Sequence, residues 1–260
     1  MGEINNVIKL GITGSTKLTL ESMKRILALQ NYEIVVLFGL SDDKLETKVN
    51  SVNMDDFCLK NNIKLLKTND WKVFGEFCKK ENVDMIITLG DSRIVPKIIV
   101  NNFEVIGNHG AILPKVQGGA SLVWGRMLAN GTWGSSIMRL GEKIDSGEIL
   151  KTRTFEYDRN TTEDEFVKIS DNTAVDLLIE VLQGKSEPQE NKKWDIRLSK
   201  HVDSYKAKEI LEYCLKNDMV IYLPPRNPDD SIVKKHWPDS FKKNFKIANN
   251  FPYPKWREEQ

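Results

Sequence analysis

The sequence is short of cysteine, histidine and net charge, and each shortage excludes a class of protein. The three cysteines, Cys58, Cys78 and Cys214, are odd in number and far apart, which excludes a disulfide framework and indicates reduced thiols in a cytoplasmic protein. Only three histidines occur in 260 residues, and no close Cys/His pair has metal-ligand spacing. The sequence therefore predicts no metal site.

Positive and negative charges nearly cancel, with 38 Lys and Arg against 37 Asp and Glu and a formal net charge of +1. This balance gives no field that would draw the chain onto nucleic acid or an anionic membrane. Mean hydropathy is −0.41, and no apolar run approaches the ~18 residues of a spanning helix. The first residues, MGEINNVIKLGITGST, carry no basic region or cleavage site of a secretion signal, which also favours the cytoplasm.

Short apolar strands alternate with amphipathic helices along the first half of the chain. The strand candidates are 7–12, 32–40, 63–66 and 85–89, and the helix candidates between them are 18–29, 54–60 and 71–80. This alternation is typical of an α/β protein with a doubly wound, mostly parallel sheet. Since the strand ends of such a sheet meet along one edge, we expect any small-molecule site of this half there.

A polar segment that contains a proline, residues 184–193, divides the chain into two predicted parts. Residues 1–184 form the first domain, which ends with a long helix that keeps an apolar stripe over 166–182. Residues 194–260 hold one helix and one strand candidate and a tail punctuated by prolines. We expect a small C-terminal accessory subdomain there.

His109 stands in the glycine-rich segment GNHGAILPKVQGG, residues 107–119, directly after an apolar run. A lone histidine more often caps a strand end and donates a hydrogen bond to a carbonyl, but these glycines allow a ligand close to the backbone. Asp145 follows 36 residues later in an Asp-Ser-Gly turn, which is an ordinary place for an aspartate. A carboxylate beside an imidazole would, however, orient the ring and keep it basic near neutral pH.

Four short segments follow one another in a set order along the middle of the chain. They are residues 108–115 (NHGAILPK), Gly118-Gly119, Asn130-Gly131 and Asp145-Ser-Gly. Together with the preceding MIITLGDSRIVPKIIV, residues 85–100, they resemble the core of the folate-dependent formyltransferases. The resemblance implies a formyltransferase catalytic domain over 1–184, with a Rossmann-like fold.

Three catalytic residues are implied by the resemblance: His109 and Asp145, which handle a proton, and Asn108, whose amide stabilises the oxyanion. The chain departs from the family pattern at Gly107, where the family has the asparagine, two positions before the histidine. On a plain strand Asn108 and His109 would face opposite ways, and a turn or bulge near Gly107 would remove this conflict. Gln117 also replaces the family's arginine before the glycine.

N10-formyltetrahydrofolate is the formyl donor that the resemblance implies. The family's donor-binding regions correspond to six residues, which are Leu89, Gly90, Ile94, Arg139, Leu140 and Ile144. A flat pteridine needs an apolar slot with a few backbone donors and acceptors. Leu89 and Ile94 are equally well explained as ordinary core residues.

The acceptor amine differs between branches of the family. A transfer-RNA partner should show as clustered positive charge, whereas this chain is near neutral. The chain most resembles the branch that formylates nucleotide-linked amino-deoxysugars for bacterial surface polysaccharides (lipopolysaccharide), with a homodimer formed through the accessory subdomain. Lys115 and Arg126 are candidate contacts to the diphosphate and Trp124 to the base, although each is equally well explained as an exposed charge or a packed ring.

Other functions stay open from the sequence. A methionyl-tRNA formyltransferase-like activity and hydrolysis of the donor are two, since the same histidine and carboxylate can activate water. A dinucleotide-binding oxidoreductase is a third, because Gly11-Ile-Thr-Gly14 lies between the first strand and helix. That turn lacks the full Gly-x-Gly-x-x-Gly pattern, which makes the third function a poor fit.

Overall fold

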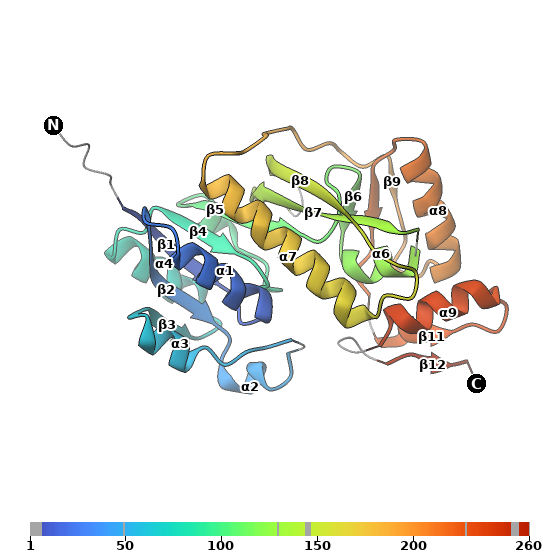
Figure 1. Cartoon of the computed structure of the whole chain (residues 1–260), viewed down its shortest axis with the longest axis horizontal. Helices are drawn as coiled ribbons and strands as arrows, with labels where there is room; N and C mark the ends of the chain where they lie inside the picture. Colours follow the sequence, from blue (N-terminus) through green and yellow to red (C-terminus); the bar gives the residue numbers. More distant parts are fainter. Residues whose placement is uncertain are drawn as a thin grey trace.

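A seven-stranded sheet forms the centre of the first part of the molecule (Figure 1). The computed structural model describes residues 7–48, 50–128, 130–143, 147–226, 228–250 and 255–259. The strands lie in the order β3-β2-β1-β4-β5-β7-β8. They are β1 (Ile8–Thr13), β2 (Tyr32–Gly39), β3 (Lys64–Lys67), β4 (Met85–Thr88), β5 (Glu104–His109), β7 (Thr132–Arg139) and β8 (Ile149–Glu156).

Strand direction divides this sheet into a parallel and an antiparallel portion. β1 to β5 are parallel neighbours, whereas β7 runs antiparallel to β5 and β8 antiparallel to β7. The predicted α/β class with a mostly parallel sheet is therefore confirmed. Because β1, β2, β4 and β5 point the same way, the loops that follow them gather at one edge.

Helices cover both faces of the sheet, as a doubly wound architecture requires (Figure 1). Met23 of α1 and Leu178 of α7 are buried in a cluster on one face, and Phe74 of α4 and Ile99 of α5 in a cluster on the other. The helices of this part are α1 (Lys17–Leu27), α2 (Asp42–Leu45), α3 (Asp55–Lys60), α4 (Trp71–Lys80), α5 (Lys97–Val100), α6 (Ser121–Leu128) and α7 (Glu163–Leu182).

Threonines cap the N-termini of α1 and α7, the two helices that lie side by side on one face of the sheet. Thr162 caps α7 by accepting a hydrogen bond from the N–H of Glu165, whose carboxylate accepts one from the Thr162 N–H. Thr16 and Thr19 form the same reciprocal box at the start of α1. Such boxes bind N–H groups that have no partner within the first helical turn, and so fix where each helix begins.

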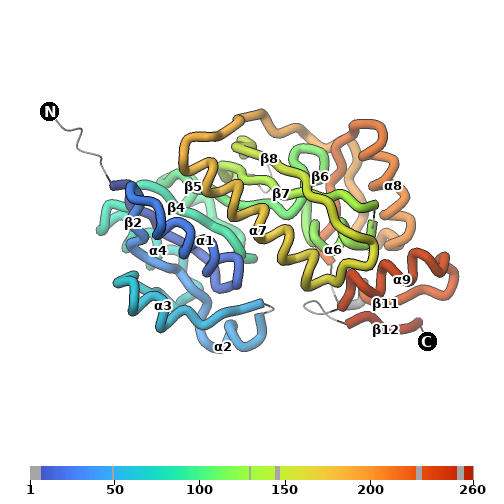
Figure 2. Tube along the Cα trace, viewed as in Figure 1, coloured from blue at the N-terminus to red at the C-terminus, as the bar shows by residue number. Residues whose placement is uncertain are grey.

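The C-terminal segment packs onto the α6 region and does not stand apart (Figure 2). Its elements are β9 (Ile196–Arg197), α8 (Ser204–Lys216), β10 (Ile221–Leu223), a 3₁₀ turn (Pro228–Ser231), β11 (Ile232–Val233), α9 (Asp239–Ala248) and β12 (Arg257–Glu258). β10 lies between β9 and β6 (Val116–Gly118), parallel to both. Trp124 and Met127 of α6 share one buried cluster with Leu211 of α8 and Phe245 of α9.

The predicted linker follows the edge of the large sheet. The N–H of Glu187 donates to the carbonyl of Leu150 at 2.7 Å, and the N–H of Gln189 to that of Ile149 at 2.9 Å. Residues 187–189 therefore lie beside the first two residues of β8, the last strand of the sheet, and pair with part of its open edge. A domain boundary at residue 184 stays a prediction, and the cluster around Trp124 contains residues from both sides of it.

All three cysteine thiols are buried and unpaired, in agreement with the sequence. Burial raises the pKa of Cys58 to about 11 and that of Cys78 to about 12, so these thiols stay protonated and unreactive at neutral pH. Within the described ranges, none of the helices combines the length and apolar character needed to cross a membrane.

Candidate functional site

His109 is the last residue of β5, and this residue is 7% exposed. The Nε2 atom lies 3.0 Å from the carbonyl oxygen of Val116. Because a carbonyl only accepts, this nitrogen carries the proton. The contact is the one expected of a histidine that caps a strand end. The predicted partner, Asp145, lies outside the described residues, so its pairing with His109 stays a prediction.

Asn108 and His109 point to opposite faces of the sheet. β5 pairs with β4 and with β7 over residues 104–109 without a shift in register, so the bulge that would bring the two side chains together is not formed there. A Cβ atom on Gly107 would lie 3.1 Å from Thr88 Cγ2 and from Leu140 Cδ2. A side chain at the position of the family's asparagine would therefore press on Thr88 and Leu140, which would have to shift by a few tenths of an ångström.

A cavity of about 240 Å³ opens at the carboxyl ends of β4 and β5, and we call it the β4–β5 cavity. Its apolar walls are Ile94, Val95, Val100 and Leu140, and its polar groups include Thr88, Asp91, Arg93 and Asn108. This is the edge where the sequence places a small-molecule site. Asn108, Ile94 and Leu140 are the predicted site residues that the structure brings together.

An ion pair that sequence reasoning missed forms the rim of this cavity. Arg93 binds the carboxylate of Asp91 through Nε at 3.0 Å and through Nη2 at 2.7 Å. The same guanidinium donates to the carbonyl of Phe38 at 2.7 Å and lies 4.0 Å above the Phe38 ring. It thereby joins the ends of β2 and β4. The signal in the sequence was an acid and a base two positions apart, directly after a strand.

Leu89, Gly90 and Arg139, which the sequence also predicts to bind the donor, do not line the cavity. Leu89 is 1% exposed in the main core, and its carbonyl accepts a hydrogen bond from Thr19 Oγ1 at 2.7 Å. Gly90 has a φ of +76° and packs against the start of α1. Arg139 pairs with Glu104 on the surface at 2.9 Å. Ile144 lies outside the described residues.

Lys115, Trp124 and Arg126, which the sequence suggests for the acceptor, are not gathered at one place. Lys115 forms an exposed ion pair with Asp218 at 2.7 Å. Trp124 is 2% exposed, and the guanidinium of Arg226 lies 5.2 Å from the centre of its ring. For Trp124 the packed-ring interpretation therefore describes what the structure shows.

Arg126 is fully buried between α6 and the start of α7. Its Nε donates to the carbonyl of Thr161 at 2.8 Å and its Nη2 to that of Arg159 at 2.7 Å. A diphosphate would reach this guanidinium only if the cluster opened. Burial also raises the pKa of the neighbouring Glu163, and the charge of Arg126 offsets part of this rise.

The N-terminus of α1, where a dinucleotide phosphate would bind, is already hydrogen-bonded. The N–H of Lys17 donates to the carbonyl of Asn50 at 3.1 Å, and Thr16 with Thr19 forms the capping box. The N–H of Gly14 donates to the carbonyl of Phe38 at 3.2 Å. Since these N–H groups would have to face the phosphate, the geometry argues against a dinucleotide site.

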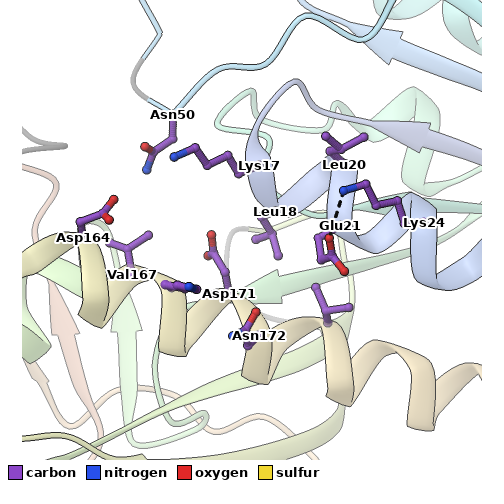
Figure 3. A pocket seen from close by; sticks show the side chains of 12 residues that line it. Lys17, Leu18, Leu20, Glu21, Lys24, Asn50, Asp164, Val167, Asp171 and Asn172 are labelled. Atoms are coloured by element: carbon purple, nitrogen blue, oxygen red, sulfur yellow. Dashed lines mark hydrogen bonds and ion pairs between the residues drawn. The ribbon is translucent and has the colours of Figure 1, made fainter. Parts of the chain in front are cut away.

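A second cavity, of about 420 Å³, lies between α1 and α7 (Figure 3), and we call it the α1–α7 groove. Asp171 of α7 points toward α1, and Lys17 extends from α1 toward Asn50. Burial raises the pKa of Asp171 to about 7, and the charge of Lys17 lowers it in part. Of the residues proposed from the sequence, those that the structure describes do not line this groove.

Comparison with known proteins gives the family. Residues 24–182 match the formyl transferase family, which is more than half of the chain, so the chain belongs to that family. The methionyl-tRNA formyltransferase of Mycoplasma mycoides subsp. mycoides is 25% identical over 150 residues, 56% of this chain and 47% of that protein. The chain spans about half the length of such curated relatives.

Solved structures share the fold. A 4-N formyltransferase from Francisella tularensis has a TM-score of 0.68 at 14% identity, over 98% of this chain and 93% of that one. The N-formyltransferase from Helicobacter canadensis in complex with folinic acid and dTDP-3-aminofucose has a TM-score of 0.62 at 16% identity, over 93% and 80%. The predicted formyltransferase fold is thereby confirmed.

Proposed function

We propose that this protein transfers a formyl group from N10-formyltetrahydrofolate to the amino group of a nucleotide-linked amino-deoxysugar. One observation carries the proposal: the β4–β5 cavity lies wholly within the part of the chain that matches the formyl transferase family. Asn108 lines that cavity, and His109 follows it directly at the end of β5.

The β4–β5 cavity fits one end of the donor. Its volume of about 240 Å³ is below the ~300–1,000 Å³ of sites for drug-sized ligands, so it would hold the pteridine while the rest of the molecule lies outside. Ile94, Val95 and Leu140 offer apolar walls to the flat ring, and Asn108 offers a polar group to its edge. A solved neighbour, the Helicobacter canadensis enzyme, holds folinic acid.

In the proposed reaction the amine nitrogen bonds to the formyl carbon, and the bond from that carbon to N10 breaks. His109 takes the proton that the amine loses, and N10 gains one as it leaves. Asp145 orients the ring of His109. Asn108 faces the opposite side of the sheet from His109, so we assign it to the donor cavity that it lines and not to the oxyanion of this step. The roles of His109 and Asp145 come from the family resemblance and are proposals for this chain.

A nucleotide-linked amino sugar is the acceptor that we favour. The formal net charge of +1 gives little attraction to transfer RNA, and the Helicobacter canadensis neighbour holds dTDP-3-aminofucose. The names of the curated relatives favour methionyl-tRNA as a second candidate. We also propose that residues 194–260 mediate a homodimer, which light scattering would test; a monomer at micromolar concentration would contradict it.

The test of this function is a set of parallel incubations. The protein and N10-formyltetrahydrofolate are mixed with nucleotide-linked 3-amino and 4-amino sugars, or with methionyl-tRNA, and the masses of the products are followed. A formylated sugar supports the proposal, and formylated methionyl-tRNA supports the second candidate. Formate without a formylated amine would indicate a hydrolase, whereas NAD(P) binding with no effect of folate would indicate an oxidoreductase.

A further inference from the structure

Three polar side chains form a row across β5, β7 and β8. Antiparallel pairing places His109 opposite Ser136, and Ser136 opposite Thr152. Residues directly opposite each other carry their side chains on the same face of a sheet. His109 is 7% exposed and Ser136 is completely buried, so the row is not a solvated surface. Buried polar groups are costly unless each is hydrogen-bonded, which raises the question of what these groups bind.

The hydroxyl of Ser136 uses its whole hydrogen-bonding capacity. It donates to the carbonyl of Ala111 at 2.7 Å, and it accepts from the N–H of Leu113 at 3.0 Å and from the hydroxyl of Thr152 at 2.9 Å. A serine hydroxyl has one donor and two acceptor positions, and all three are used here. Two of the three bonds go to the backbone turn that begins two residues after His109.

This turn also supplies the partner of the histidine ring. Ala111 and Leu113, which Ser136 binds, flank Ile112, and the N–H of Val116 donates to the carbonyl of Ile112 at 2.9 Å. The carbonyl of Val116 lies 3.0 Å from His109 Nε2. Hydrogen bonds, together with the backbone bonds of residues 111–116 between them, therefore connect the Ser136 hydroxyl to the imidazole.

We propose that Ser136 is a positioning residue, which holds the His109 ring in its orientation by fixing the turn 111–116. The part of this inference that concerns turnover rests on the proposed function, whereas the part that concerns the ring does not. Ser135 is a matched control because it is equally buried and adjacent on β7. Its hydroxyl makes one longer contact, of 3.4 Å, to the backbone carbonyl of His109.

The first experiment observes the ring itself by NMR of protein with ¹⁵N-labelled histidine. The chain has three histidines, and the His109→Asn variant identifies the His109 Nε2–H signal. We expect a slowly exchanging signal in the unmodified protein and in Ser135→Ala, and exchange at least about tenfold faster in Ser136→Ala, as the loss of one net hydrogen bond predicts. An unchanged exchange rate in Ser136→Ala would overturn the proposal, whatever the activity.

The second experiment uses formyl transfer. We expect Ser136→Ala to lower kcat about tenfold and to leave the dissociation constant of the donor unchanged, since no residue of the β4–β5 cavity is altered. Thr152→Val removes one of the three bonds and should give a smaller loss. Equal losses in Ser135→Ala and Ser136→Ala would overturn the proposal in favour of general packing. If the unmodified protein transfers no formyl group, the proposed function fails while the NMR comparison still decides the role of Ser136.

Discussion

The β4–β5 cavity and the α1–α7 groove are both lined by charged side chains, but they stabilise charge in different ways. In the cavity the carboxylate of Asp91 is 2% exposed and is bound at two points by Arg93, which also reaches backbone carbonyls. In the groove, burial raises the pKa of Asp171 to about 7, and Lys17 offsets only part of this. At the strand ends, hydrogen bonds to several elements hold Asp91 and Arg93 in their charged forms. Between the two packed helices, the charge of Asp171 depends on pH.

The largest difference between the two regions should be in catalysis. His109→Ala, and separately Asp145→Ala, should lower formyl transfer by about 10²–10⁴-fold, because each removes a group that handles the transferred proton. Both variants should melt close to the unmodified protein, as followed by circular dichroism. Asp171→Asn in the groove is the control and should keep full turnover. Normal turnover in His109→Ala would contradict the catalytic role of His109.

A second difference concerns the cost of removing one charge. Asp91→Asn leaves the guanidinium of Arg93 without its buried partner and should lower the free energy of unfolding by about 3 kcal/mol in urea titrations. Glu76→Gln breaks an exposed pair with Lys72 and should cost less than about 1 kcal/mol. Similar costs for the two variants would mean that the rim of the cavity is no better anchored than the surface.

The dependence of stability on pH should come in part from the groove. Burial raises the pKa of Asp171 from its ordinary 3.8 to about 7, so the folded protein binds this proton more tightly than the unfolded chain. Stability should therefore fall as the pH rises from about 4 to about 7, by about 2 kcal/mol after allowance for partial solvent access. Asp171→Asn should remove this part of the pH dependence, and an unchanged profile in urea titrations would contradict the assignment.

The smallest effect is expected at the other side of the groove. The charge of Lys17 lowers the pKa of Asp171, so Lys17→Met should move the stability transition of Asp171 to a higher pH. Thermal melts between pH 5 and 9 measure this shift. The exposed Lys60→Met is the control and should leave the transition in place, whereas a downward shift in Lys17→Met would mean that Lys17 does not face Asp171 in solution.

Local patterns predicted the elements and their order. The helix expected at residues 71–80 is α4, and the strand expected at 32–40 is β2 with one residue fewer. Periodicity was sufficient because these segments bury one face or both faces against near neighbours. The edge that holds the β4–β5 cavity followed from the alternation of strands and helices alone.

Side-chain surroundings were harder to predict because they depend on segments far away in sequence. From the sequence, Arg126 could be an exposed cation. In the structure α6 packs against α7, α8 and α9, and the guanidinium of Arg126 is fully buried. The row of His109, Ser136 and Thr152 depends on the registers of two strand pairs. The spacing of apolar residues and the short motifs do not predict which residues of two strands lie opposite each other.

The pairing of β6 with β10 has a consequence for synthesis on the ribosome. The N–H of Ile221 donates to the carbonyl of Lys115, and the N–H of Gly119 to that of Leu223. A nascent chain that has emerged only as far as α7 therefore lacks the strand that completes β6, directly beside Val116. We therefore expect the loop after β5 to reach its final arrangement only when about a hundred further residues, as far as β10, have been translated.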